Sequence, residues 1–236
     1  HMADELSNAD AMKNEFISSV SHELRTPLTA IRGWAETIRT ERDPVIFKKG
    51  IRVITNETER LSQMVEELLD FSRMQSGHFT LQQSAMDVLA ELGEAALIYA
   101  ERAKIEDITM TYEEPEMLPV VYGDKNRIRQ VFINIIDNAI KYSNRGGTVK
   151  IVAGTSPEGD IRVTVEDNGC GIRKSDLPKI KTKFYKANHT KKGSGIGLAV
   201  ADEIIQMHGG TLTLESEEGK GTKVTITIPP QKPEDK

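Results

Sequence analysis

The first 77 residues contain two apolar stripes, and each has the spacing of one face of an α-helix. Apolar side chains recur there at steps of three and four residues, whereas a half-buried strand would alternate at every second residue. The pattern predicts a hairpin of two long helices. The first stripe consists of Phe16, Val20, Leu24, Leu28, Ile31, Ala35 and Ile38. The second consists of Phe47, Ile51, Ile54, Leu61, Val65 and Leu68, with the hydroxyl residues Thr58 and Ser72 at the same spacing.

The residues that flank the stripes set the expected helix ends. We expect the first helix over residues 3–41. Asp43 suits the N-cap of the second helix and Pro44 its first turn, while Gly77 is expected to end it. Pro27 removes one amide hydrogen bond from the first helix, so a kink is expected close to His22.

A single hairpin of this kind cannot bury both of its apolar stripes. Two chains that pair through their hairpins would form a four-helix bundle with a shared core, so we expect a homodimer. A hairpin that lies on the C-terminal domain of its own chain is the alternative.

From Thr80 onwards the pattern becomes mixed α/β, with no internal repeats. The tail, residues 231–236, is rich in proline and charge and is expected to be disordered. Helices are expected over residues 85–104, capped by Asp87, over residues 125–142, capped by Asp124, and over residues 197–208. Strands are expected over residues 108–112, 149–153, 161–166, 211–215 and 223–228.

Composition excludes several classes of protein. The net charge of −5 argues against nucleic acid as the main partner. A single cysteine, Cys170, excludes a disulfide framework and suits a reducing compartment. No apolar run approaches the length of a membrane span. The opening His1-Met2 resembles a cloning remnant, so we expect a fragment of a longer protein.

His22 lies opposite the first apolar stripe when the segment is set on a helix. It shares the solvent-facing side with Ser18, Thr26 and Thr29. No second histidine or cysteine stands at a metal-ligand spacing from it. Taken alone, this could be an ordinary surface histidine, but the second half of the chain carries the features of a nucleotide site.

The helix over residues 125–142 has a polar face that suits Mg²⁺ and phosphate. Asn134, Asn138 and Lys141 fall within about 60° of one another on that face. Phe132, Ile136, Ala139 and Ile140 occupy the opposite face. Magnesium binds few protein ligands and keeps waters and phosphates, which fits two carboxamides beside an ammonium group. The alternative is a polar face turned to solvent.

Two glycine-rich stretches complete the candidate site. Glu166–Gly171 ends a strand-like run, where glycines permit close approach of a flat ligand and Asp167 could accept a hydrogen bond from an amino group. Gly193–Leu198 opens a helix and exposes backbone amides to an anion, but it lacks the Walker A ending. The lysine-rich segment before it suits a lid over triphosphate or, alternatively, a solvated loop.

In content and in order, these motifs resemble the boxes of bacterial sensor histidine kinases over about residues 12–230. S-H-E-L-R-T-P-L-T resembles the H box, N-I-I-D-N-A-I-K-Y the N box and E-D-N-G-C-G-I the first glycine box. K-F-Y-K resembles the F box, G-S-G-I-G-L-A-V the second glycine box and G-K-G-T the terminal glycine element.

The resemblance implies a multidomain α and α+β protein. Residues 1–77 would be the dimerisation and histidine phosphotransfer hairpin, forming a dimeric four-helix bundle. Residues 80–230 would be an ATP-binding catalytic domain of the Bergerat type, an α/β sandwich with helices on one face of a mixed sheet.

The resemblance also implies roles in the hairpin. His22 would be the phosphoacceptor, and Glu23 would orient or deprotonate it. Adjacent residues are 100° apart on a helix, so spacing alone does not pair these two side chains. Thr26, a helical neighbour of His22, would position water for dephosphorylation of a partner response regulator.

For the nucleotide, the resemblance implies ATP and Mg²⁺. Asn138, with help from Asn134, would hold the metal, and Lys141 would touch phosphate. Tyr142 would flank the adenine, and Asp167 would read its amino group. Further contacts are implied for Gly169, Gly171, Ile172, Lys186, Ser194, Ile196, Leu198 and Thr222, with Gly193, Gly195 and Gly197 shaping the lid hinge and Phe184 and Tyr185 anchoring the lid.

The implied function is ATP-dependent autophosphorylation of His22 and transfer to an aspartate of a response regulator receiver domain, with phosphatase activity as an expected addition. Related ATPases such as gyrase and MutL carry a glutamate where this chain has Asn134. A neutral carboxamide cannot act as a general base, so water should be a poor nucleophile here. A catalytically degenerate, dimerising adaptor is the alternative. The fragment would be cytoplasmic, and its parent would be anchored in the bacterial cell membrane through an upstream sensor segment.

Overall fold

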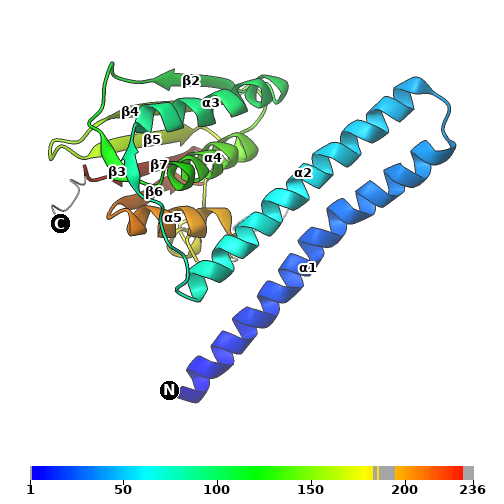
Figure 1. The fold of residues 1–236 in the computed structure, drawn as a ribbon, viewed down its shortest axis with the longest axis horizontal. Coiled ribbons are helices and arrows are strands. Elements are labelled where there is room, and N and C mark those ends of the chain that lie inside the picture. The colour runs from blue at the N-terminus through cyan, green and yellow to red at the C-terminus, as the bar shows by residue number, and fades with distance from the viewer. Residues whose placement is uncertain (1, 183–184, 186–194, 231–236) are drawn as a thin grey trace. The chain divides into compact units, whose positions relative to one another are not determined.

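The computed structural model describes residues 2–182, 185 and 195–230 (Figure 1). The chain divides into two compact units. Residues 1–77 belong to the first unit, and most of residues 78–236 belong to the second. The first unit is helical and the second is α/β. A helical region followed by an α/β region confirms the predicted fold class.

The first unit is an antiparallel hairpin of α1 (Met2–Thr40) and α2 (Pro44–Gln75) (Figure 1). Both helices end within two residues of their predicted positions. α1 continues through Pro27, whose side chain is buried. The proline therefore interrupts one amide hydrogen bond of the helix without ending it.

Two carboxylates fix the turn between α1 and α2. Glu41 Oε1 accepts hydrogen bonds from the backbone amides of Arg42, at 2.7 Å, and Asp43, at 2.9 Å. Asp43 in turn caps α2, because its Oδ1 accepts the Val45 amide at 2.8 Å. The predicted Asp43-Pro44 start of the second helix is confirmed.

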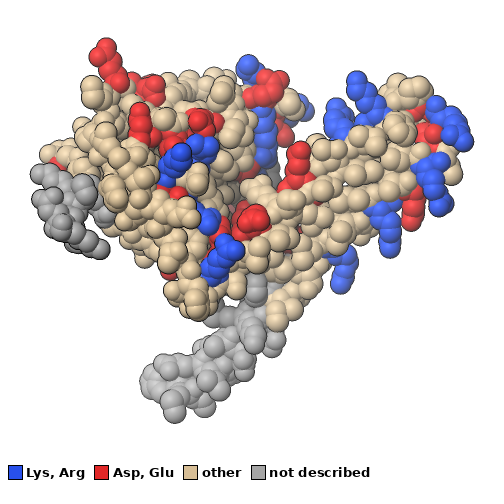
Figure 2. All heavy atoms as spheres, in the orientation of Figure 1, with Lys and Arg blue, Asp and Glu red and all other residues tan. Residues whose placement is uncertain are grey.

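Close to this turn, Gly50 of α2 packs tightly against α1. A Cβ at Gly50 would overlap the Ile38 side chain and lie 2.9 Å from the Trp34 ring. Lys49 Nζ lies 5.7 Å from the centroid of the same ring, within the range of a cation–π contact. Figure 2 shows lysine and arginine side chains gathered at this end of the hairpin.

Several apolar side chains of the hairpin remain exposed. Leu28 of the first stripe is 54% exposed. Phe47, Ile51 and Val65 of the second stripe are 44–47% exposed. The single hairpin thus buries only part of each predicted stripe.

The second unit contains a five-stranded mixed sheet. The first two strands in spatial order are parallel, and the other neighbours are antiparallel. In spatial order the strands are β2 (Thr109–Glu113), β4 (Thr148–Thr155), β5 (Ile161–Asp167), β7 (Gly221–Ile228) and β6 (Thr211–Glu217).

Three helices, α3 (Val88–Ile105), α4 (Lys125–Tyr142) and α5 (Gly197–Met207), lie over one face of this sheet (Figure 1). In β5, Val163 and Val165 are buried whereas Arg162 and Glu166 are exposed. That alternation is typical of a sheet covered on one side. The predicted α/β sandwich is confirmed.

Two short strands were not predicted. β1 (Ser84–Met86) pairs antiparallel with β3 (Val121–Gly123), and a 3₁₀ turn, η1, spans Leu177–Lys179. The helix predicted over residues 85–104 therefore starts too early. The N-cap expected for this helix, Asp87, is confirmed, because its Oδ1 accepts the Leu89 amide at 2.9 Å.

His208, directly after α5, joins that helix to the start of α4. Its Nε2 accepts the Asp124 amide at 2.9 Å, and its Nδ1 lies 2.7 Å from the Ile204 carbonyl oxygen. These two contacts require the neutral ring with its proton on Nδ1. The side chain is 1% exposed, and burial lowers the pKa of His208 below its usual value.

We predict that His208 makes the protein less stable in acid. Because its pKa is lower in the folded state, the unfolded chain takes up the proton first as pH falls below about 6.5. Stability should therefore decrease with falling pH in that window and lose this dependence above it. Calorimetric melting between pH 5 and 8 measures the effect.

The His208→Gln variant should melt lower than the wild type at pH 8 but show a flatter pH dependence. His78→Gln serves as the control, because His78 is exposed and should leave the dependence unchanged. Equal pH dependence in the wild type and His208→Gln would contradict the assignment.

Candidate functional site

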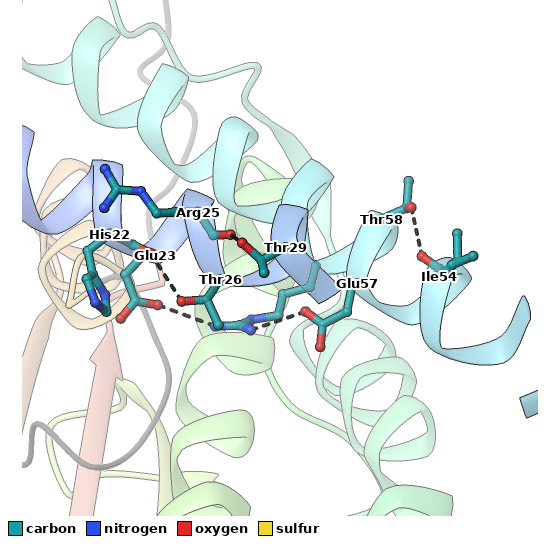
Figure 3. Close-up of polar contacts among 9 residues, drawn as sticks. His22, Glu23, Arg25, Thr26, Thr29, Ile54, Glu57 and Thr58 are labelled. Carbon is teal, nitrogen blue, oxygen red and sulfur yellow. Dashed lines mark hydrogen bonds and ion pairs between the residues drawn. The ribbon is translucent and has the colours of Figure 1, made fainter. Parts of the chain in front are cut away.

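His22 is an exposed residue of α1, as the helical spacing predicts. Thr26, one turn later, directs its hydroxyl back along the helix and donates to the His22 carbonyl oxygen at 3.3 Å (Figure 3). Thr29 donates in the same way to the Arg25 carbonyl oxygen at 2.8 Å. The imidazole thus stands on a regular, solvent-facing stretch of helix.

Glu23 faces α2 and is largely shielded from solvent, with 15% of its side chain exposed. Arg60 of α2 donates through Nη2 to Glu23 Oε2 at 3.3 Å and through Nη1 to Glu57 Oε2 at 3.3 Å. Sequence reasoning missed Arg60, because pairing across a hairpin depends on the register of the two helices. A cation on the polar side of α2 was the available signal.

α4 carries the predicted metal and phosphate residues on one side and apolar residues on the other. Asp124 caps the helix by accepting the amides of Asn126, at 3.1 Å, and Arg127, at 3.2 Å. Asn138 and Lys141 are half-buried, while Phe132, Ile136, Ala139 and Ile140 are buried as expected. Lys141 Nζ lies 5.0 Å from the Tyr142 ring centroid.

Asn134 is buried rather than presented to solvent. It is 7% exposed, and its Nδ2 donates to the Gly197 carbonyl oxygen at 3.1 Å. A Cβ at Gly197 would meet the Asn134 carboxamide at 3.5 Å. One of the two predicted metal-binding amides therefore also connects α4 to the first residue of α5.

Asp167 ends β5 as a buried carboxylate. Its Oδ1 accepts the Gly169 amide at 2.9 Å, and Thr222 on β7 lies opposite it in the sheet. Burial raises the pKa of Asp167, and hydrogen bonds from the Gly169 and Thr222 amides partly oppose this effect. The carboxylate is thus held at a fixed position where one β-strand meets a tight turn.

Glycines in this region permit close contacts between backbone segments. A Cβ at Gly169 would overlap the Tyr142 carbonyl oxygen, and one at Gly221 would overlap the Asp167 carbonyl oxygen. Gly171 has φ +62°, and a Cβ there would overlap the Glu217 carbonyl oxygen. The turn after β5 is therefore pressed between the end of α4 and the β6–β7 hairpin.

Ser216 completes this arrangement and was not predicted. Its Oγ accepts the Ile172 amide at 2.8 Å, donates to the Gly221 carbonyl oxygen at 2.8 Å and lies 2.9 Å from Thr222 Oγ1. These contacts tie the first glycine turn to the terminal glycine element. The structure thereby brings together Asp167, Gly169, Gly171, Ile172 and Thr222, all predicted site residues.

The segment after this turn contains a second polar cluster around Asp176. Asp176 is buried, accepts the Tyr185 hydroxyl at 2.8 Å and pairs with Arg173 Nε at 3.0 Å. The hydrogen bond between Tyr185 and Asp176 lowers the pKa of Asp176 and raises that of Tyr185. Tyr185 is therefore tied to the segment that starts the predicted lid.

Part of the predicted lid can be placed. Gly195 has φ +70°, a conformation that favours glycine, and Ile196 is buried. Gly197 and Leu198 begin α5 and are half-buried. The predicted residues Phe184, Lys186, Gly193 and Ser194 lie outside the described residues.

Two family models match the chain. Residues 12–77 match the His Kinase A (phospho-acceptor) domain, and residues 123–232 match the Histidine kinase-, DNA gyrase B-, and HSP90-like ATPase. The chain belongs to the sensor histidine kinase family. Sensor protein SrrB of Staphylococcus aureus strain MRSA252 is 34% identical to this kinase core over 235 residues.

The alignment covers 96% of the chain but 39% of SrrB, so this kinase core spans well under half the length of the curated relatives it matches. Solved structures of histidine kinases are also similar to this chain. The Acinetobacter baumannii histidine kinase AdeS is 29% identical, with a TM-score of 0.67 over 89% of this chain and 98% of that chain. Histidine kinase ThkA in complex with response regulator protein TrrA is 27% identical, with a TM-score of 0.68 over 97% and 64%.

Among the described residues, no helix has both the length and the apolar character needed to cross a bilayer. Within the same residues, no three His, Cys, Asp or Glu side chains gather in a way that could hold a metal ion.

We predict that Gly169→Ala weakens both the fold and ATP binding. The added methyl group would overlap the Tyr142 carbonyl oxygen and displace the turn that carries Asp167. Overpacking of this kind costs about 1–3 kcal/mol. Thermal melting and titration with a fluorescent ATP analogue measure the two effects.

Gly154→Ala is the matched control, since nothing lies within 4 Å of a Cβ at that position in β4. Its melting temperature and ATP affinity should stay close to those of the wild type. Indistinguishable results for the two alanine variants would show that the close contact at Gly169 is unimportant.

Proposed function

We propose that this kinase core phosphorylates itself on His22 with ATP and then passes the phosphoryl group to an aspartate of a response regulator receiver domain. The observation that carries the proposal is an exposed histidine on a phosphoacceptor-type helix, in a chain whose second unit matches the ATPase family. That ThkA is found in complex with response regulator TrrA supports the choice of partner.

The two units would divide the work. Residues 1–77 would form the dimerisation and phosphotransfer hairpin and residues 80–230 the ATP-binding domain. Exposure of Leu28, Phe47, Ile51 and Val65 favours a homodimer, because a second hairpin would cover these side chains in a four-helix bundle. Burial of an apolar side chain of this size contributes about 1.5–3 kcal/mol.

The region around Asp167 suits an adenine ring. A buried carboxylate can accept a hydrogen bond from the exocyclic amino group, and the Gly169 turn keeps that carboxylate next to the end of α4. Tyr142 would flank the ring, since its carbonyl oxygen accepts the Cys170 amide at 3.1 Å and so lies beside this turn. Lys141, the preceding residue, would contact phosphate.

Magnesium would be held by Asn138 together with phosphate oxygens and water. A carboxamide oxygen is a hard ligand that suits this ion, and Asn138 is half-buried on the polar side of α4. Asn134 would help through its Oδ1, since its Nδ2 is the atom that donates to the Gly197 carbonyl oxygen. When bound, the ion would neutralise charge on the phosphates.

The phosphoryl transfer itself requires mainly that the attacking nitrogen and the γ-phosphate are held in the right positions. A nitrogen of the neutral His22 ring would attack the γ-phosphorus, and Glu23 would accept the proton that the ring then gives up. Thr26 would position water for dephosphorylation of the regulator, after its hydroxyl leaves the His22 carbonyl oxygen. The complete protein would be anchored in the bacterial membrane through an upstream sensor segment, with this core on the cytoplasmic side.

The first test is incubation with γ-labelled ATP and Mg²⁺. We expect acid-labile, alkali-stable label on the wild type and none on His22→Gln, because a phosphoramidate forms only on the histidine. His78→Gln, the loss of another exposed histidine, should label like the wild type. Undiminished label on His22→Gln would refute the assignment of the phosphoacceptor.

A second test addresses the metal. Asn138→Ala should lower the initial rate of His22 labelling about 100-fold or more, since charge stabilisation by a metal ion is worth several kcal/mol. The melting temperature should change little, because the side chain is only half-buried. A titration of the labelling rate with Mg²⁺ provides the measurement.

Asn126→Ala is the control for this test, since Asn126 is an exposed asparagine in the first turn of the same helix. Its labelling rate should match that of the wild type. Retained labelling in Asn138→Ala, at wild-type Mg²⁺ dependence, would remove Asn138 from the metal site.

A further inference from the structure

Arg60 contacts a carboxylate on each helix of the hairpin. Its Nη2 lies 3.3 Å from Glu23 Oε2 on α1, and its Nη1 lies 3.3 Å from Glu57 Oε2 on α2. The three side chains are 15–25% exposed, whereas the pair of Lys104 and Glu101 is more than 75% exposed. Solvent therefore screens the Arg60 contacts less than those of a surface pair.

Glu23 is the residue directly after His22. Figure 3 shows the His22 ring and the Glu23 carboxylate on the same side of the α1 ribbon. The dashed contact between this carboxylate and α2 lies on the side where Glu57 is drawn. Helix geometry alone places adjacent side chains 100° apart. A contact from outside α1 is therefore needed to hold the Glu23 carboxylate in one orientation, and the Arg60 guanidinium provides that contact.

We propose that Arg60 is a positioning residue for autophosphorylation, acting through Glu23. This inference rests on the proposed function of His22 as phosphoacceptor. A glutamate side chain loses rotamer freedom when it is fixed, which opposes its ordering. Arg60 fixes the Glu23 side chain before ATP binds, so the transfer step does not have to include this loss of freedom.

Glu57 gives Arg60 a second contact and so fixes the guanidinium itself. Glu57 and Arg60 are three residues apart on α2, a spacing at which side chains on a helix meet. The planar guanidinium can bind one carboxylate through each terminal nitrogen, which a lysine ammonium cannot reproduce. Loss of Arg60 would also leave Glu23 and Glu57 facing each other without the cation between them.

The step that this arrangement serves is balanced in atoms and charge. A ring nitrogen of neutral His22 forms a bond to the γ-phosphorus, and the bond from that phosphorus to the β–γ bridging oxygen breaks. ADP leaves with the electron pair of that bond. The ring, now carrying an extra positive charge, gives the proton on its other nitrogen to the Glu23 carboxylate.

The test compares the rate of His22 labelling at saturating ATP with the KM for ATP. Proton transfer to a positioned base contributes roughly 10²–10⁴-fold, and we expect the loss of positioning in Arg60→Gln to remove about tenfold of it. The KM for ATP should stay within about twofold, since no ATP-binding residue changes. Arg60→Lys should recover part of the rate, because it keeps the charge next to Glu23.

A double variant separates positioning from a general structural effect. If Arg60 acts through Glu23, adding Arg60→Gln to Glu23→Gln should cause no further loss of rate. Arg52→Gln is the matched control, an exposed arginine about two turns earlier on α2, and should label like the wild type. Melting curves of all variants report whether the hairpin remains folded.

The outcomes are distinguishable. No label on the wild type would overturn the proposed function and this inference with it. A labelled wild type with an unchanged or higher rate in Arg60→Gln would overturn this inference alone. Equal losses from Arg60→Gln with and without Glu23 present would also overturn it, since Arg60 would then act on the fold and not through the carboxylate.

Discussion

The burial of one face of α4 determines where its other face points. Ile128, Phe132, Ile135 and Ile136 are at most 1% exposed. Burial of each such side chain contributes about 1.5–3 kcal/mol to stability. Rotation of the helix about its axis would lose several of these contributions, which is more than a polar contact on its other side provides. The positions of Asn134, Asn138 and Lys141 are thus consequences of the core.

Direct backbone contact forms the second constraint on the site. The turn after β5 lies against the end of α4 and against β7 with glycine at each close approach, so no side chain separates these segments. Asp167 is buried at this junction, where desolvation and two amide hydrogen bonds act on its carboxylate in opposite directions. A rigid acceptor of this kind suits recognition of a flat ring better than a carboxylate on a free loop would.

The hairpin differs from the second unit in what it leaves unfinished. Its apolar stripes are partly exposed, which is the expected state of one half of a bundle. Its polar side, in contrast, carries ordered contacts around His22, the proposed phosphoacceptor: the Thr26 hydroxyl on the His22 carbonyl and the Arg60 bridge between Glu23 and Glu57. Ordered contacts near His22, together with exposed apolar stripes, suit a segment that binds several partners one after another.

The sequence by itself determined the helices, the strands of the large sheet and the motif residues. Helical and strand periodicity depends on neighbours a few residues apart, and so the apolar stripes, the Asp43 and Asp124 caps and the alternation in β5 could be read directly. Only the tertiary structure decided the contacts between distant segments. β1 pairs with β3 across more than thirty residues, Asn134 turns to Gly197, and Arg60 reaches Glu23 because of the hairpin register. His208, which the sequence did not distinguish from a surface residue, is a buried contact for the same reason: Asp124, whose amide donates to its Nε2, lies 84 residues away in the sequence, and only the packed core brings the two together.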